Sequence, residues 1–151
     1  MRISAKVDYA VRATIELARA GDGPMKGDRI ATAQGIPVHF LENILADLRR
    51  AGLVGSRRGT EGGYWLAVPA GDVSVADVVR AVEGPLADVR GEPPEALRYP
   101  AATEALRDTW VALRANVRDV LERVSVADLA TGSLPKHVLA LLDEPDAWAR
   151  R

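Results

Sequence analysis

Apolar side chains recur every three or four residues along the first part of the chain, which is the spacing of one face of an α-helix. The clearest run predicts a helix over residues 38–51 that Gly52 ends; it consists of Leu41, Ile44, Leu45 and Leu48. A helix over residues 4–20 is expected to bury a stripe formed by Val7, Ala10, Val11, Thr14, Ile15 and Ala18. A short helix over residues 28–34, closed by Gly35, is expected between them.

After Gly52 the pattern changes from helical spacing to short extended runs. Residues 53–58 and 64–68 read as two strands, and the Gly-rich segment 59–63 between them tolerates the backbone angles of a hairpin loop. Ser74 and Asp77 then have the spacing of a capping box, which predicts a helix that Gly84-Pro85 breaks.

The C-terminal half is expected to contain a loop over residues 86–100, a long helix over about 102–124, a short capped helix from Ser125 to Gly132, and a last helix over 136–142. One seam of the long helix has heptad-like spacing and consists of Leu106, Trp110, Leu113, Val117, Val120 and Val124. Such a seam is typical of a dimer interface, although it can also pack within one chain.

Helix, short helix, turn, helix and hairpin, in that order, is the layout of a winged helix-turn-helix domain. The expected fold is therefore mainly α with a small two-stranded β wing and a long dimerisation helix. The expected segments are a DNA-binding domain over residues 1–69, a connecting helix and loop over 70–101, dimerisation helices over 102–131, and a C-terminal tail helix over 132–151.

The outward positions of the 38–51 helix and the hairpin supply candidate DNA contacts. Asn43 can offer a bidentate amide to adenine, Glu42 can accept from the amino group of cytosine, and His39 can donate to a base or a phosphate. The arginines suit phosphates or a minor groove. The candidates from these elements are Val38, His39, Phe40, Glu42, Asn43, Arg49, Arg50, Arg57, Arg58, Gly59 and Thr60.

Charge supports a polyanionic partner modestly. Residues 1–69 carry ten Lys and Arg against seven Asp and Glu, a net of +3, whereas residues 70–151 carry ten against fourteen, a net of −4. No apolar run approaches the roughly 20 residues that span a bilayer, and the N-terminus lacks an apolar signal-peptide core, so a cytoplasmic protein is expected.

The chain contains no cysteine, which removes disulfides, thiolate catalysis and cysteine-ligated clusters. Its two histidines, His39 and His137, do not have the spacing of a metal motif, although either can join carboxylates in a site. No nucleophile–base pairing or cofactor loop is evident, so no cofactor and no enzymatic activity are expected. The loop 59–63 resembles a phosphate cradle only in its glycines, because the Lys-Ser/Thr of nucleotide-binding loops is missing.

Two interpretations remain for the winged-helix layout. The first is a sequence-specific transcription regulator on double-stranded DNA. The second is a protein–protein interaction module that does not bind DNA specifically, because an exposed charged helix face is often only solvated. The hairpin arginines favour the first interpretation, and the small net charge favours the second.

Several stretches match a known family over about residues 1–131. They are Lys6-Val-Asp-Tyr-Ala10, Gly35-Ile-Pro-Val-His-Phe-Leu-Glu42, Leu48-Arg-Arg-Ala-Gly-Leu-Val54, Arg58-Gly-Thr-Glu-Gly-Gly-Tyr-Trp-Leu66, Val78-Val-Arg-Ala-Val-Glu-Gly-Pro85, Leu106-Arg-Asp-Thr-Trp110 and Val126-Ala-Asp-Leu129. With these stretches the chain resembles the Rrf2 family of winged-helix regulators, which includes iron–sulfur-cluster, nitric-oxide-sensing and cysteine-metabolism repressors.

The resemblance implies a homodimeric repressor with crossed long helices that presents two recognition helices and two wings to a palindromic operator. The site residues that it implies are Phe40, Glu42 and Asn43 for the bases, Arg58 and Gly59 for the minor groove, and Arg2, Lys6 and Tyr9 for the DNA backbone.

The chain departs from this family in one respect. Many members hold a cluster with three cysteines in the loop that corresponds to residues 87–100, and some complete it from the first helix, where this chain has Asp8 and Arg12. Without cysteine, that form of ligation is not available. The signal is then expected to be a small molecule, a protein partner, or nothing beyond the protein's own concentration.

Overall fold

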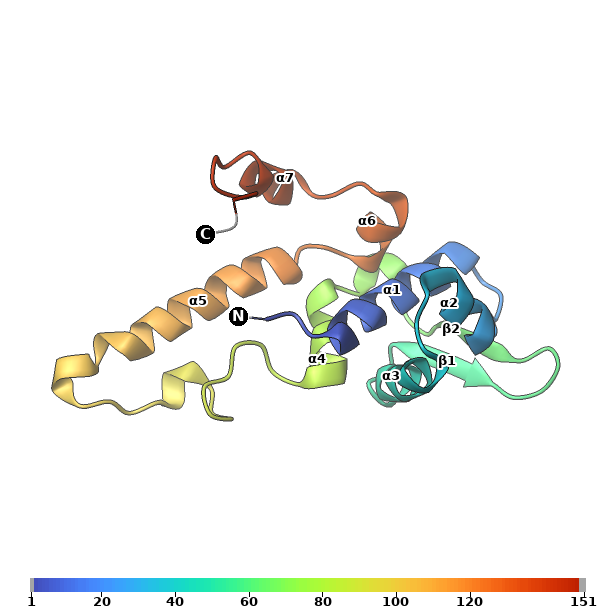
Figure 1. Cartoon of the computed structure of the whole chain (residues 1–151), viewed down its shortest axis with the longest axis horizontal. Coiled ribbons are helices and arrows are strands. Elements are labelled where there is room, and N and C mark those ends of the chain that lie inside the picture. Colours follow the sequence, from blue (N-terminus) through green and yellow to red (C-terminus); the bar gives the residue numbers. More distant parts are fainter. Residues whose placement is uncertain (1, 150–151) are drawn as a thin grey trace.

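The computed structural model of the chain describes residues 2–149. Met1, at the start of the expected segment 1–69, and Arg150 and Arg151, at the end of the expected segment 132–151, lie outside the described residues. The helices are α1 (Ala5–Ala20), α2 (Gly27–Gln34), α3 (Val38–Arg50), α4 (Val75–Glu83), α5 (Ala105–Leu121), α6 (Val126–Thr131) and α7 (Lys136–Leu142), and the strands are β1 (Val54–Arg57) and β2 (Gly63–Leu66). Short 3₁₀ helices lie at Ala70–Asp72, Pro94–Ala96 and Ala101–Thr103. This is the predicted mainly α fold with a two-stranded wing (Figure 1).

Helix α3 buries the four residues that the sequence assigned to the core, Leu41, Ile44, Leu45 and Leu48. The stripe predicted for α1 was partly wrong. Its buried residues are Val7, Ala10, Ala13, Thr14 and Leu17, whereas Val11, Ile15 and Ala18 are only half-buried. The reason is that α1 packs against α3, α4, α6 and β2, so the buried face is wider than one stripe and is rotated from it.

The wing is tied to the loop between α1 and α2. β1 and β2 pair antiparallel, with Val54 opposite Leu66 and Arg57 opposite Gly63. Met25 adds a third strand position, because its backbone N–H donates to Tyr64 and its carbonyl accepts from Tyr64, both at 2.8 Å. A side chain at Gly63 would place Cβ 2.6 Å from the Met25 carbonyl oxygen, so the pairing requires glycine there.

Residues 73–77 and 124–128 meet in a symmetric junction. The backbone N–H of Val75 donates to Val124 at 2.9 Å, and that of Val126 donates to Val73 at 2.8 Å. Val75 and Val126 are the first residues of α4 and α6. Both helices start with the same Ser-Val-Ala-Asp sequence, and each has a complete capping box. The junction closes the segment 84–123, here called the arm, onto the winged-helix body (Figure 1).

The arm leaves α5 with little cover from its own chain. No residue of α5 is buried, and Figure 1 shows the helix extending away from α1–α4. The helix is also shorter than predicted, because a 3₁₀ turn precedes it and it ends at Leu121. Val124 therefore lies beyond the helix, only 5% exposed, and its carbonyl is used by the junction. No helix in the described part of the chain is long and apolar enough to cross a membrane.

Candidate nucleic-acid interface

Helix α3 carries one fully exposed polar face opposite its buried leucines. The residues of this face are Val38, His39, Phe40, Glu42, Asn43, Arg49 and Arg50, all of which are exposed. Phe40 is 57% exposed, and its ring meets Tyr9 of α1 edge-on at 6.3 Å between centroids. An exposed aromatic ring held by a neighbour is suited to apolar contact with a partner rather than to the core.

The polar groups on this face have only weak partners within the chain. The side-chain amide of Asn43 donates to the His39 carbonyl at 3.0 Å, and Nδ1 of His39 lies 3.8 Å from a carboxylate oxygen of Glu42. Exposed contacts of this kind contribute little to stability. His39, Glu42 and Asn43 can therefore exchange these contacts for base edges at a small cost in free energy. Arg50, by contrast, forms an ion pair with Asp47 at 2.7 Å.

The two arginines of the wing differ in their contacts. Arg57 donates to the Glu61 carbonyl at 3.0 Å across the turn, so it helps to shape the hairpin. Arg58 is exposed and makes no hydrogen bond or ion pair with residues 2–149, and it is followed by the exposed residues Gly59 and Thr60. A guanidinium without a protein partner at a hairpin tip is free to bind an anion.

Two basic contacts join the wing to the helices. Nη1 of Arg49 donates to Ser56 of β1 at 3.2 Å, which links α3 to the hairpin. Nζ of Lys26 donates to the Gly59 carbonyl at 2.7 Å. Sequence reasoning missed Lys26, since its partner lies 33 residues away; the only signal was a basic residue directly before a short helix.

Of the three residues expected from the first helix and its start, Lys6 is engaged inside the protein. Its Nζ lies 2.7 Å from the Asp47 carboxylate of α3 and donates to the Val82 carbonyl of α4, also at 2.7 Å. The ammonium thus joins three helices, and these two contacts use two of its three N–H donors. Arg2 is exposed, and Tyr9 is half-buried below Arg12, whose guanidinium carbon lies 5.6 Å from the ring centre.

The arm loop over residues 86–100 is held by packing and an ion pair. Pro94 and Leu97 are buried, and Glu95 lies 2.6 Å from Arg114 of α5. Asp8 and Arg12 pair with each other at 3.1 Å on α1. Within residues 2–149 no group of three or more His, Cys, Asp or Glu side chains is placed to hold a metal ion.

The sequence comparisons identify related regulators. Residues 3–132 match the family described as "Rrf2: Iron-dependent Transcriptional regulator". A protein of Mycobacterium tuberculosis named as an HTH-type transcriptional regulator is 52% identical over 145 residues, which cover 95% of this chain and 90% of that protein. The HTH-type transcriptional regulator CymR of Bacillus subtilis is 36% identical over 132 residues, 87% of this chain and 91% of CymR. These names describe a regulatory, non-enzymatic role, in agreement with the prediction.

Solved structures show the same architecture. The structure of CymR, the global cysteine regulator of B. subtilis, matches with a TM-score of 0.71 and 36% identity, over 87% of this chain and 98% of that chain. The structure of T. potens IscR matches with a TM-score of 0.72 and 32% identity, over 89% of each chain.

The ion pair between Lys6 and Asp47 generates a prediction about pH. The hydrogen bond from Lys6, and more weakly Arg50, hold the pKa of Asp47 below its ordinary value of 3.8, against the opposing effect of burial. Because the folded-state pKa is depressed, the carboxylate stabilises the fold fully above pH 3.8 and loses this contribution as the pH falls through the folded value. Asp47→Asn should therefore lower the free energy of unfolding by about 1 kcal/mol at neutral pH, because solvent screens this partly exposed pair, and the loss should shrink in acid.

Urea unfolding followed by circular dichroism at several pH values measures this difference. Asp119→Asn is the matched control, because its i,i+4 ion pair with Arg123 is exposed and its loss should change stability by only about 0.3–0.5 kcal/mol. An Asp47→Asn variant as stable as the wild type at neutral pH would show that the pair does not hold α1 against α3.

Proposed function

The chain belongs to the Rrf2 family of DNA-binding transcriptional regulators, and on that premise we propose that it is a homodimeric repressor of a palindromic operator. One observation carries the proposal. The chain exposes the polar face of α3 and a partner-free arginine on the wing, while α5 extends from the body without a single buried residue. The first pair of features suits a polyanion, and the uncovered helix suits contact with a second chain.

In this proposal α3 lies in the major groove. Asn43 contacts adenine, Glu42 accepts from cytosine, and His39 donates to a base or phosphate. Val38 and Phe40 offer apolar surface to thymine methyl groups. The remaining proposed contacts, mainly to phosphates or a minor groove, are Arg49, Arg50, Arg57, Arg58, Gly59, Thr60, Arg2 and Tyr9.

We propose a different role for one residue. Lys6 was expected to contact the DNA backbone, but its ammonium is used by Asp47 and by the Val82 carbonyl. We therefore assign it to positioning, since it fixes α1 and α4 against the recognition helix. Lys26 is a better candidate for a phosphate near the wing, because it is exposed and lies beside Gly59.

The dimer is proposed to form through α5. Leu106 and Leu113 are 38% and 39% exposed, and the other seam residues of this helix, Trp110, Val117 and Val120, are only half-buried. An apolar seam of this length is normally covered in a soluble protein. Val124 is left out of the proposed interface, because it is buried in its own chain. Two copies joined in this way present two recognition helices to two half-sites.

The segment boundaries follow from the same proposal. Residues 1–69 bind DNA, 70–101 connect, and 102–131 contain the dimerisation helix α5, while the last helix of that segment, α6, packs against α1 of its own chain. The tail 132–151 lies almost entirely beyond the family match, which ends at residue 132. A regulator of transcription acts where the chromosome is, so a bacterial chain of this kind is proposed to act in the cytoplasm. Its effector is proposed to be a small molecule or a protein.

A cysteine-ligated iron–sulfur cluster does not fit this chain. The family description refers to iron, but the sequence supplies no thiolate. In the arm loop Glu95 is engaged with Arg114, and on α1 Asp8 is engaged with Arg12. Anaerobic reconstitution with iron and sulfide should therefore give no stoichiometric, stable visible absorption. A reproducible cluster spectrum would show that carboxylate and histidine ligands have replaced cysteine.

The dimer interface is tested by placing charge on the seam. The double variant Leu113→Asp, Val117→Asp should be monomeric in sedimentation velocity, because two carboxylates per chain would have to be buried. The matched control is Leu139→Asp, Leu141→Asp, which changes two exposed leucines of α7 and should leave the dimer intact. A seam variant that stayed fully dimeric would place the interface elsewhere.

Substitutions in the recognition helix and in the wing should have different effects on DNA binding. Asn43→Ala should relax the preference for one base in each half-site by about 1–3 kcal/mol and leave the salt dependence of binding nearly unchanged. Arg58→Ala should weaken binding to every sequence and reduce the slope of log affinity against log salt by about one for each phosphate that the arginine no longer neutralises.

Fluorescence anisotropy on a selected operator and on a scrambled duplex, each at several salt concentrations, separates the two effects. Arg98→Ala is the control, because Arg98 is exposed on the arm loop away from α3 and the wing. All three substitutions are on the surface and should change stability by less than about 0.5 kcal/mol. If folded Arg58→Ala binds both duplexes as the wild type does, the wing makes no DNA contact.

A further inference from the structure

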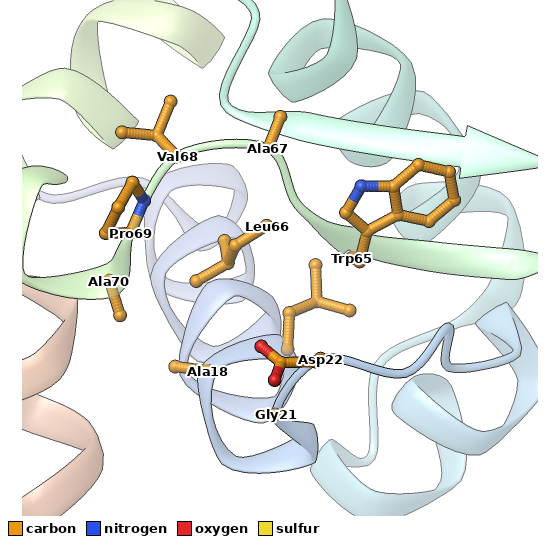
Figure 2. Close-up of a pocket in the computed structure, with 10 residues that line it drawn as sticks. Ala18, Gly21, Asp22, Trp65, Leu66, Ala67, Val68, Pro69 and Ala70 are labelled. Carbon is orange, nitrogen blue, oxygen red and sulfur yellow. The ribbon is translucent and has the colours of Figure 1, made fainter.

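A cleft of about 470 Å³ lies on the body at the base of the wing, between the end of α1 and the chain that leaves β2. Figure 2 shows Asp22 and Trp65 at this cleft together with the aliphatic side chains of Leu66, Val68 and Pro69. None of these lining residues belongs to the proposed DNA-contact set. The volume lies within the range of small-molecule sites, about 300–1,000 Å³.

The charge at this cleft is negative from two sources. The carboxylate of Asp22 faces the cleft in Figure 2, is exposed, and forms no ion pair within residues 2–149. The C-terminal turn of α1 ends here as well: Leu17 and Ala18 line the cleft, and Gly21 caps the helix. The carbonyl groups of a helix C-terminus carry a partial negative charge that favours a cation. The basic residue of this turn, Arg19, is engaged with Glu16 and with the Ala130 carbonyl.

The aromatic side chain at the cleft favours the same kind of ligand. The indole of Trp65 packs on the backbone of Gly55 in β1, so closely that a Cβ atom at Gly55 would lie 2.5 Å from Cε2 of the ring. The ring is thereby held in one orientation and is only half-buried. The part of the indole that stays exposed offers flat apolar surface to the body of such a ligand.

We propose that this cleft binds a small organic cation, an ammonium group on a compact apolar body. The ammonium group pairs with Asp22 and the end of α1, and the apolar body lies against Trp65 and the aliphatic wall. A neutral molecule of the same shape lacks the ionic contact and binds much more weakly. An anion is repelled by both sources of negative charge.

The position of the cleft also connects it to the wing. Asp22 is three residues before Met25, whose backbone pairs with Tyr64, the residue next to Trp65. A ligand that contacts Asp22 and Trp65 together fixes the α1–α2 loop against the hairpin. This effector role rests on the proposed function of the wing in DNA binding, whereas binding of the cation does not.

Binding is tested on the full chain, without DNA, by amide and indole NMR titration with phenethylammonium chloride. Saturable shifts are expected at Gly21, Asp22 and the Trp65 indole N–H, which Trp65→Phe assigns. Asp22→Asn should weaken the affinity for phenethylammonium by roughly tenfold. The neutral analogue 2-phenylethanol should bind the wild type as weakly as phenethylammonium binds Asp22→Asn. Asp28→Asn, which removes an exposed carboxylate on α2, should keep the affinity within about twofold.

No saturable shift at these three residues, or equal affinity for the alcohol, would overturn the site. The effector role is measured separately, by the anisotropy of labelled operator with and without the amine at constant ionic strength. The amine should change DNA affinity at least about threefold in the wild type and not in Asp22→Asn. Binding without a change in DNA affinity would overturn the effector role alone, and a chain that bound no DNA would refute the proposed function and leave the NMR result intact.

Discussion

The position of the arm depends on one short backbone pairing. Two hydrogen bonds, from Val75 to Val124 and from Val126 to Val73, join the start of α4 to the start of α6. Each helix then begins with its own Ser-Asp capping box, which satisfies N–H groups that the junction would otherwise leave unpaired. Since α1 packs against both α4 and α6, the junction fixes where α5 leaves the body, and in the proposed dimer it would set how far the two α3 helices stand apart.

Inside the body, an ionic contact has a comparable role for α3. Apolar packing of four buried side chains fixes which face of this helix meets the body. The Lys6 ammonium adds directional contacts, because it meets Asp47 and the Val82 carbonyl, both at 2.7 Å. The edge-on pair of Tyr9 and Phe40 acts at the first turn of the same helix. An arginine could not replace Lys6 without change, because its planar fork has a different geometry.

The sequence predicted elements well where burial follows one periodicity. The core face of α3 was correct because a single stripe is covered, and each α-helix and strand within residues 2–149 was expected close to its observed place, whereas the three 3₁₀ helices were not expected. The face of α1 was partly wrong because this helix has neighbours on several sides. Contacts between distant segments left no local signal: Met25 with Tyr64, Lys26 with Gly59, and Lys6 with Asp47. The cleft beside Trp65 was not foreseen either, since it forms only when α1 and the end of β2 meet.

The arm loop and the wing suggest how a regulator of this family can work without thiolates. In this chain the loop is ordered by buried Pro94 and Leu97 and by the ion pair of Glu95 with Arg114, so its conformation requires no bound cluster. A loop that is already ordered has little conformational freedom left through which a thiolate-bound cluster could act. The wing is different, because its pairing with Met25 is a single residue pair at the edge of a two-stranded sheet. A ligand that stabilised this edge would act directly on the hairpin that is proposed to contact DNA, and so the base of the wing is the better place for a signal to enter.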